Sequence, residues 1–268
     1  MNRDEALRHL QIDGWYVIEG VIPDGEVGAV RESVERSTAA HRNPEAPEGI
    51  GHVPGFIRYN QSLAPYLADR AVLGIVEAML GHHVRISFTT ATINYPGNQR
   101  GNWHADWPFN QNNAGHIPAP YPDATMHLTT LWMLSPFTRE NGGTLIVPGS
   151  HRANNNPTGD NGVDAGKPYP TEMQATGPAG SVLVIDSRMW HATAPNRSNE
   201  PRTSVVVRYA PWWLNLDVIM PGSVDRARLV DETGGRDNLV PLVPPQVYAA
   251  LPDDVKPLFR HWVEVEAN

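Results

Sequence analysis

The sequence predicts a mainly β protein with flanking helices, and three observations support this class. Short segments rich in Val, Ile, Phe and Thr recur between residues 83 and 210, separated by turns rich in Pro and Gly, which is typical of an antiparallel sandwich or barrel. Helical periodicity is confined to the residues before 82 and to the tail. Eight Trp and 40% hydrophobic residues suffice for one sizeable core.

The first 82 residues form the predicted helical flank. In order, we expect a helix over residues 4–11, a strand over 15–18, a helix over 23–38, a loop over 41–54 and a helix over 69–80. In the second helix, Val residues recur on one stripe opposite Glu and Arg. The third is amphipathic, and Gly81 ends it.

The predicted β core covers about residues 83–215. Strands are expected over residues 83–95, 125–134, 144–147, 181–186 and 203–210. Two long loops interrupt this core at residues 107–123 and 151–178. Loops of this length are usually functional or disordered, so we interpret both as substrate walls or lids.

The tail is a C-terminal extension over about residues 216–268, and it follows Trp212 and Trp213. A helix is predicted from Pro245 to about residue 263. Three roles stay open for the tail: packing on the core, covering a pocket, or contacting another subunit. We expect one domain over residues 1–268, because candidate ligands at 104 and 191 must meet in one core.

Composition excludes several classes of function. The chain has no Cys, so thiolate metal sites, iron–sulfur clusters and Cys nucleophiles are excluded. The net charge of −8 and the scattered Arg disfavour nucleic acid as a partner. No apolar run approaches the length of a membrane span and no signal peptide is visible, so we expect no membrane partner and a cytoplasmic location. Oligomeric state is not readable.

Residues 102–107, NWHADW, carry the strongest signal of a metal site. If this segment is a strand, His104 and Asp106 point to one face, because side chains alternate with period two. His191, in a turn after the strand at 181–186, offers a third ligand. Two His and one carboxylate on one face of an ion are typical of non-haem Fe(II) oxygenases. The alternative for His104 and Asp106 is a hydrogen-bonded pair at the surface.

An anion clamp is predicted eleven residues after His191. Arg202 opens the strand at 203–210, and its planar fork suits one carboxylate. A 2-oxo acid that chelates iron needs a cation for its far carboxylate, and Thr193 can add a hydroxyl to that grip. The alternative for Arg202 is a salt bridge at the rim, and Thr193 is otherwise a turn residue.

In these motifs the chain resembles the phytanoyl-CoA dioxygenase (PhyH) family of Fe(II)/2-oxoglutarate oxygenases. His104, Asp106, His191 and Arg202 match the family's spacing. Residues 140–151, ENGGTLIVPGSH, are close to its NG-x-L-x-x-x-PGSH run, and residues 13–18 with 22–23 resemble its N-terminal opening. The resemblance spans roughly residues 1–215. It implies a double-stranded β-helix (a jelly-roll, cupin-like core) that binds Fe(II), 2-oxoglutarate and O2 and releases succinate and CO2.

Further residues are weaker candidates. For the cosubstrate they are Asn102, which shares the face of His104, and Asn94 and Trp132. For the substrate they are Trp107, Phe109, His127, Arg188 and Trp213. Core packing is the alternative for the aromatic residues and for His127. His151 is interpreted as ordering a turn rather than binding metal.

The expected reaction is oxidation of a small molecule. Halogenating relatives in the resembled group carry a small residue in place of Asp106, so its carboxylate favours hydroxylation, desaturation, epoxidation or cyclisation. The aromatic and amide-rich candidates suggest a neutral, medium-sized metabolite, such as a natural-product intermediate. Two alternatives stay open: a cupin-like metal enzyme that does not use 2-oxoglutarate, and a non-catalytic jelly roll that binds small molecules.

Overall fold

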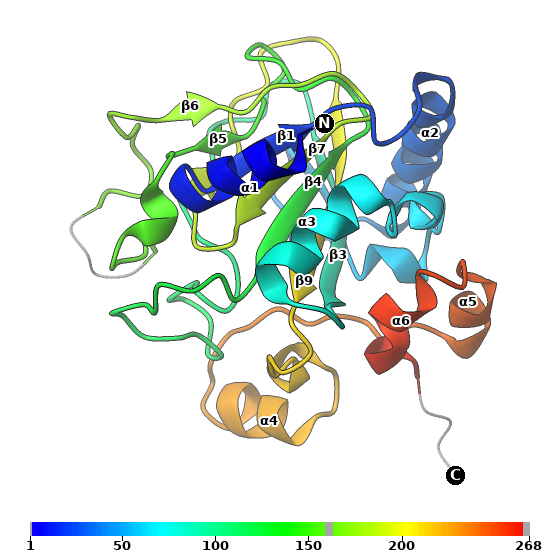
Figure 1. The fold of residues 1–268 in the computed structure, drawn as a ribbon, viewed down its shortest axis with the longest axis vertical. Coiled ribbons are helices and arrows are strands. Elements are labelled where there is room, and N and C mark those ends of the chain that lie inside the picture. Colours follow the sequence, from blue (N-terminus) through cyan, green and yellow to red (C-terminus); the bar gives the residue numbers. More distant parts are fainter. Residues whose placement is uncertain (1, 159–162, 265–268) are drawn as a thin grey trace.

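One large antiparallel sheet forms the centre of the protein. The structure is a computed structural model that describes residues 2–158 and 163–264. The sheet has the strand order β1-β7-β4-β9-β3-β2, and every neighbouring pair runs antiparallel (Figure 1). Its strands are β1 (Trp15–Ile18), β2 (Ile50–Pro54), β3 (Arg85–Asn94), β4 (Leu128–Met133), β7 (Val182–Asp186) and β9 (Arg202–Ala210).

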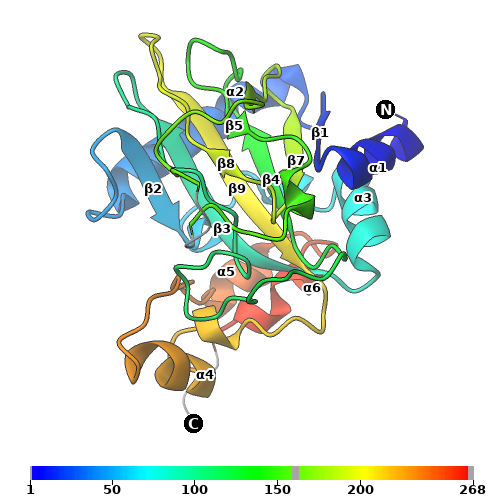
Figure 2. The same cartoon turned by 90° about the vertical axis from the view of Figure 1, so that its left-hand side faces the viewer.

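A smaller sheet lies against one face of the large one, near β4 and β9 (Figure 2). It has the order β6-β5-β8, with β5 (Leu145–Ile146), β6 (Met173–Gln174) and β8 (His191–Ala192). Ile146 of β5 packs in one buried cluster with Leu131 of β4 and Val206 of β9. Two facing antiparallel sheets are the jelly-roll arrangement, and this prediction is confirmed.

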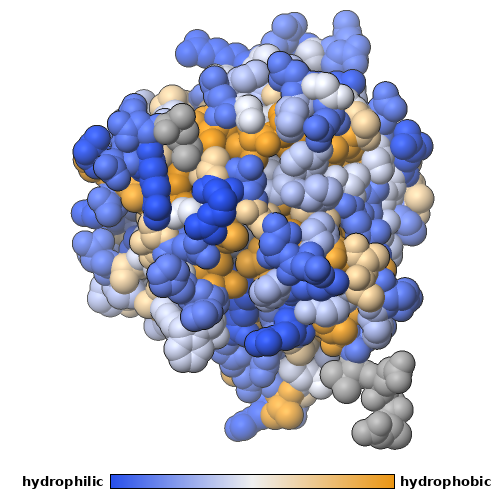
Figure 3. All heavy atoms as spheres, turned by 45° about the vertical axis from the view of Figure 1, so that its right-hand side comes forward, coloured by the Kyte–Doolittle hydropathy of each residue, from blue (hydrophilic) through white to orange (hydrophobic). Residues whose placement is uncertain are grey.

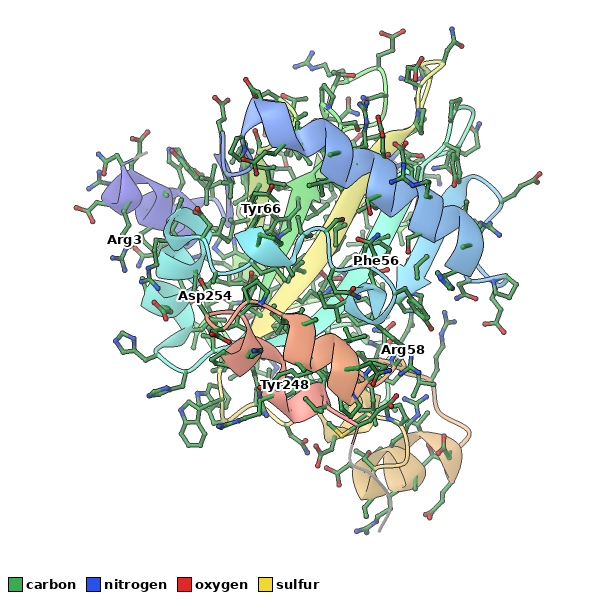
Figure 4. All side chains as sticks on the ribbon, turned by 90° about the vertical axis from the view of Figure 1, so that its right-hand side faces the viewer. Arg3, Phe56, Arg58, Tyr66, Tyr248 and Asp254 are labelled. Atoms are coloured by element: carbon green, nitrogen blue, oxygen red, sulfur yellow. The ribbon has the colours of Figure 1, made fainter. Side chains whose placement is uncertain are left out.

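Three helices cover the opposite face of the large sheet. They are α1 (Arg3–Ile12), α2 (Asp24–His41) and α3 (Arg70–Leu80), as predicted from their periodicity. The buried stripe of α2 consists of Val27, Val30, Val34 and Thr38. Figure 4 shows α2 lying across the strands, and its stripe joins the main apolar core of the protein. The short helical turns are η1 (Phe56–Arg58), η2 (Ala64–Tyr66), η3 (Ser150–Arg152), η4 (Asp217–Ile219), η5 (Ala227–Asp231) and η6 (Arg260–Trp262).

The tail differs from the expectation of one helix over residues 245–263, which is wrong. It forms α4 (Val224–Arg226), α5 (Pro245–Ala250) and α6 (Lys256–Phe259). Leu251 is extended (ψ 151°) because it precedes Pro252, and a residue before proline is driven out of the helical region. The tail packs on the core: Trp262 Nε1 donates to the Ile86 carbonyl at 2.7 Å, and Arg58, labelled in Figure 4, donates to the Leu242 carbonyl at 2.6 Å.

Residues 41–54 were expected to form a loop, but residues 50–54 form the edge strand β2, so the prediction is wrong for these residues. A Cβ at Gly51 would lie 3.0 Å from Thr38 Cγ2 and 3.0 Å from the Tyr95 hydroxyl, so glycine allows close packing here without displacing these side chains. Gly and Pro favour turns in a single sequence, which hid this strand. Across the described residues, no helix is both long enough and apolar enough to span a membrane. Figure 3 shows polar residues over much of one face, with apolar residues between them.

Candidate metal centre

The inner face of the large sheet forms one wall of a cavity. Residues that oppose one another across β3, β9 and β4 share this face, because side chains alternate along each strand. One such row is Phe88, Arg208 and Thr129, and the next is Thr90, Val206 and Leu131. All six line a cavity of about 230 Å³. A wider outer chamber of about 700 Å³ shares His52, His104, Asp106 and Arg208 with it.

His104 and His191 are held side by side by a two-way backbone bridge. The His104 amide donates to the His191 carbonyl at 3.1 Å, and the His191 amide donates to the His104 carbonyl at 2.9 Å. The ring centroids lie 4.2 Å apart. The segment expected to be a strand is therefore only an isolated bridge, but Asp106 still reaches the same cavity. One side-chain ligand atom from each of the three residues lies within 4.8 Å of the other two.

The outer hydrogen bonds of the two histidines orient their rings. His104 Nδ1 lies 3.1 Å from the Asn102 carbonyl, and His191 Nδ1 lies 2.9 Å from the Met189 carbonyl. Each Nδ1 therefore carries the proton, and each Nε2 keeps its lone pair for a metal. Burial lowers the pKa of His104 to about 4, so its imidazole is neutral at neutral pH, as a ligand must be.

Both oxygens of Asp106 accept strong hydrogen bonds. Thr129 Oγ1 donates to Oδ2 at 2.5 Å, and Arg208 Nη2 donates to Oδ1 at 2.5 Å. Burial alone would raise the pKa of this carboxyl, but the positive charge of Arg208 and the hydrogen bond from Thr129 oppose it, and the pKa lies well below its usual range. In the metal-free protein Asp106 is thus ionised, and both of its oxygens are held by hydrogen bonds.

A buried hydroxyl chain leads from Asp106 to His127. Ser187 Oγ lies 2.9 Å from Thr129 Oγ1 and 2.7 Å from His127 Nδ1, and Ser87 Oγ lies 2.7 Å from His127 Nε2. Thr129 donates to Asp106 at one end of this chain, and Ser87 Oγ at the other end also donates to the Arg208 carbonyl at 3.2 Å. Burial lowers the pKa of His127 to about 3, so its imidazole is neutral at neutral pH.

Arg202 is buried in the same cavity without a carboxylate partner among the described residues. Only 2% of its surface is exposed. Its Nη1 donates to Thr144 Oγ1 at 3.2 Å, and its guanidinium lies 4.4 Å from the Phe137 ring centre. Within the part of the chain that the structure describes, its Nε has no hydrogen-bond partner. Burial lowers the pKa of Arg202 to about 10, which still leaves it cationic at neutral pH. Thr193 lines the cavity beside it.

The comparison with family models decides the affiliation. The model of the phytanoyl-CoA dioxygenase (PhyH) family matches residues 10–204. The chain belongs to this family. The match contains all three metal-ligand candidates and Arg202.

Curated relatives of this PhyH-family protein agree with the affiliation. A protein named dioxygenase af480 from Aspergillus fumigatus is 27% identical over 78% of this chain and 67% of its own length. An ectoine dioxygenase from Bordetella bronchiseptica is 27% identical over 76% of this chain and 74% of its own length. These relatives are dioxygenases, as the resemblance predicted.

Solved structures agree in fold. The epimerase SnoN, in complex with Fe3+, alpha ketoglutarate and nogalamycin RO, matches with a TM-score of 0.64 at 19% identity, over 78% of this chain and 83% of that one. HygX from Streptomyces hygroscopicus, with nickel and 2-oxoglutarate bound, matches with a TM-score of 0.61 at 21% identity, over 79% and 88%. Two imidazoles and one carboxylate within reach of one point also fit a divalent iron by their chemistry.

The structure distributes the weaker candidates of this PhyH-family chain between the cavity and the core. Trp107 lines the outer chamber. Asn94 lies outside the cavity lining and donates through Nδ2 to the Ala194 carbonyl at 3.0 Å. Asn102 serves through its carbonyl, which accepts from His104. Trp132 faces the helices, because Leu131 beside it faces the cavity.

The other substrate candidates lie away from the lining of both chambers. Phe109 is fully buried against Tyr121, and Arg188 is fixed by both oxygens of Asp186. His127 belongs to the hydroxyl chain. Trp213 is 52% exposed. His151 lies in η3 and is buried, with Nε2 3.3 Å from the Gln11 carbonyl.

The two long loops differ in position. The loop at 107–123 lines the outer chamber through Trp107, Asn110 and Asn113. The described part of the loop at 151–178 lines neither chamber. It packs against Trp103, whose Nε1 donates to the Lys167 carbonyl at 2.8 Å. Residues 159–162 of this loop lie outside the described residues. The tail reaches the cavity instead, through Asn238.

Sequence reasoning missed Arg208, Thr129 and His52 as cavity residues. Arg208 follows Arg202 by six positions on one strand, and an even spacing places both on one face. That spacing was the available signal for Arg208. Nothing in the sequence indicated which residues of β4 and β2 would oppose it.

Proposed function

We propose that His104, Asp106 and His191 bind one Fe(II) ion and that Arg202 binds the far carboxylate of 2-oxoglutarate in the same cavity. The protein then oxidises a small organic molecule with O2, and 2-oxoglutarate leaves as succinate and CO2. The observation that carries this proposal is the buried, unpaired guanidinium of Arg202 in the cavity of the three ligand candidates. A buried cation without a counter-ion is costly, so it indicates an anionic ligand.

The residues of the chain contribute orientation and charge. Asp106 and the two histidines would hold three positions on one side of the ion, and bound iron would supply the activation of O2. Thr129 and the hydroxyl chain fix Asp106 in its ionised form. Thr144 and Thr193 lie with Arg202 at the cosubstrate end, where their hydroxyls can complete the hydrogen bonds of a carboxylate.

The outer chamber is the proposed entrance for the substrate. Its lining is polar, with Asn43, Asn110, Asn113, Asn238, Glu45, Asp237, Arg236 and Arg208. It therefore carries more charge than the neutral substrate expected from the sequence would need. The proposed substrate is a small, polar organic molecule, in keeping with relatives that are named for small compounds, such as the ectoine dioxygenase.

The retained carboxylate of Asp106 supports oxygenation rather than halogenation. In halogenating relatives, as the resemblance implies, a small residue replaces this carboxylate and leaves its position to a halide. We propose hydroxylation, or desaturation, epoxidation or cyclisation, as the outcome, within one oxygenase domain over residues 1–268.

Release of labelled CO2 from 2-oxoglutarate labelled at its first carbon tests this function without a known substrate. We expect slow, Fe(II)-dependent release by the wild type, release near background by Arg202→Met, and release at the wild-type rate by the control Arg152→Met, which alters an exposed arginine. Iron-loaded wild-type protein that releases no CO2 would favour the cupin-like or binding-protein alternatives. Equal release by Arg202→Met would remove this residue from the cosubstrate site.

A further inference from the structure

Arg208 is a second arginine in the cavity, and the cosubstrate does not account for it. It lies six residues beyond Arg202 on β9, a separation of about 20 Å between backbone positions at the usual rise of a strand. The two arginines therefore mark different ends of one wall. Arg202 lies with Thr144, whereas Arg208 contacts Asp106 and Phe88.

The hydrogen bonds of Arg208 are mostly unused. A guanidinium has five N–H donors, and among the described residues only Nη2 donates, to Asp106. The Phe88 ring centre lies 5.0 Å from the guanidinium carbon, so the ring covers one face of the planar group. Nε is buried and has no partner among the described residues, which leaves Nη1 and the second hydrogen of Nη2 for a ligand. The side chain is 15% exposed and lines both the inner cavity and the outer chamber.

Among the described residues, no other acidic group of the chamber forms an ion pair with Arg208. The carboxylate of Asp237 accepts from the Gly115 amide at 2.9 Å and from the Asn238 amide at 2.8 Å, and Glu45 is exposed. Burial and the positive charge of Arg208 lower the pKa of the neighbouring His52 to about 4. In the metal-free protein, Asp106 is therefore the anion that balances Arg208.

Metal binding changes this balance. If the proposed function holds, Asp106 becomes a ligand of a dication, and 2-oxoglutarate brings two negative charges against Arg202. Adding the charges of the ion, Asp106, 2-oxoglutarate and both arginines leaves one positive charge uncompensated beside the metal. A substrate with one negative charge would neutralise it, and a planar guanidinium edge fits a carboxylate best.

We propose that the substrate is a carboxylic acid whose carboxylate binds Arg208 once metal and 2-oxoglutarate occupy the site. This inference rests on the proposed function and specifies its substrate class. Because Arg208 is hydrogen-bonded to a metal-ligand candidate, the carboxylate lies close to the ion. The carbon that is oxidised is then near that carboxylate, at its α or β position.

The test uses Zn(II)-loaded protein with saturating 2-oxoglutarate, which cannot turn over. Binding of metal and of 2-oxoglutarate is measured first by calorimetry for the wild type, Arg208→Met, Arg208→Lys and the control Arg152→Met. Formate, acetate and benzoate are then titrated, each against its primary amide. We expect the wild type and the control to prefer the best-bound acid by about ten-fold or more, as one charge-assisted contact provides. Arg208→Met should lose the preference and Arg208→Lys should keep part of it.

The outcomes separate the two proposals. If 2-oxoglutarate does not bind the metal-loaded wild type, the proposed function fails and the inference fails with it. If 2-oxoglutarate binds but no acid is preferred over its amide, only the inference fails. The inference is also overturned if Arg208→Met still prefers the acid over its amide. It is overturned as well if the acids bind only by displacing 2-oxoglutarate. If Arg208→Met loses metal affinity alone, Arg208 only positions Asp106 and the inference is overturned.

Discussion

The two arginines of β9 differ in how their charge is balanced. Arg202 is 2% exposed and contacts a hydroxyl and an aromatic ring. Arg208 is less buried and pairs with Asp106 at 2.5 Å. Both lie on the same face of the same strand and line the same cavity.

Arg202 is therefore a buried cation with no carboxylate partner among the described residues, whereas Arg208 is one half of an ion pair with Asp106. Holding Arg202 unpaired costs stability, and burial accordingly lowers its pKa to about 10. That free energy returns when an anion binds. Arg208 costs little while Asp106 is free, and its charge becomes available only when a metal competes for the carboxylate. We propose that the first arginine prepares the site for a cosubstrate and that the second couples metal binding to a further anion.

Replacing Asp106 should have the largest effect, because it removes both a metal-ligand candidate and the partner of Arg208. In Asp106→Ala the metal loses its only carboxylate ligand and Arg208 loses its partner. We expect metal affinity to fall by more than about 100-fold and CO2 release to become undetectable, since metal sites depend strongly on each ligand. Calorimetric metal titration measures this, with the exposed Asp164→Ala as control. Unchanged metal affinity would exclude Asp106 as a ligand.

Methionine at each arginine should shift thermal stability in opposite directions. Arg202→Met removes an unpaired buried charge, so the metal-free protein should melt at a higher temperature, while 2-oxoglutarate affinity falls about 100-fold through lost charge-assisted hydrogen bonds. Arg208→Met leaves Asp106 without its cation and should melt at a lower temperature. Calorimetric melting and cosubstrate titration measure both effects. Shifts of the same sign in the two variants would contradict the comparison.

Thr129→Val should weaken the metal site without affecting the Arg202 end. The change removes the hydroxyl that donates to Asp106 at 2.5 Å and keeps the shape of the side chain. We expect metal affinity to fall about ten-fold, as for other partners of metal ligands, with 2-oxoglutarate affinity little changed. Thr130→Val is the matched control, since its hydroxyl donates to the Val207 carbonyl instead. Equal losses in both variants would argue for a general packing effect.

Acid should destabilise the fold through its buried histidines, including His127 and His261. Burial lowers the pKa of His127 and of His261 to about 3, from an ordinary value of 6.5. Between these values the unfolded chain binds more protons than the folded protein, so the free energy of unfolding is highest above pH 6.5 and falls toward pH 3. The slope approaches about 1.4 kcal/mol per pH unit for each histidine. Urea unfolding across this range measures it, and His261→Gln should flatten the slope.

The smallest effect is expected at Trp213. It is 52% exposed and lies outside both chambers. Trp213→Ser should change the free energy of unfolding by less than about 0.5 kcal/mol and leave metal and 2-oxoglutarate affinities unchanged. A clear loss of 2-oxoglutarate affinity in this variant would show that Trp213 contributes to the cosubstrate site.

The sequence predicted the candidate site through local patterns and missed what depends on pairing between strands. The spacing of His104 and Asp106 and the position of Arg202 are visible within short segments, and the family motifs order them. The role of Thr129 depends on its register opposite Arg208, which no local pattern contains. The same limit hid β2, where Gly51 allows close packing, and the break at Pro252 lay inside a segment with helical periodicity.

An anaerobic titration of metal-free protein with Fe(II) and then 2-oxoglutarate tests the central claim most directly. The weak visible charge-transfer absorption of the iron–2-oxoglutarate chelate reports both ligands at once. The account predicts this band in the wild type, no band in His191→Ala, and a band in Arg202→Met only at much higher 2-oxoglutarate concentration. Wild-type protein that binds iron but shows no band at saturating 2-oxoglutarate would contradict it.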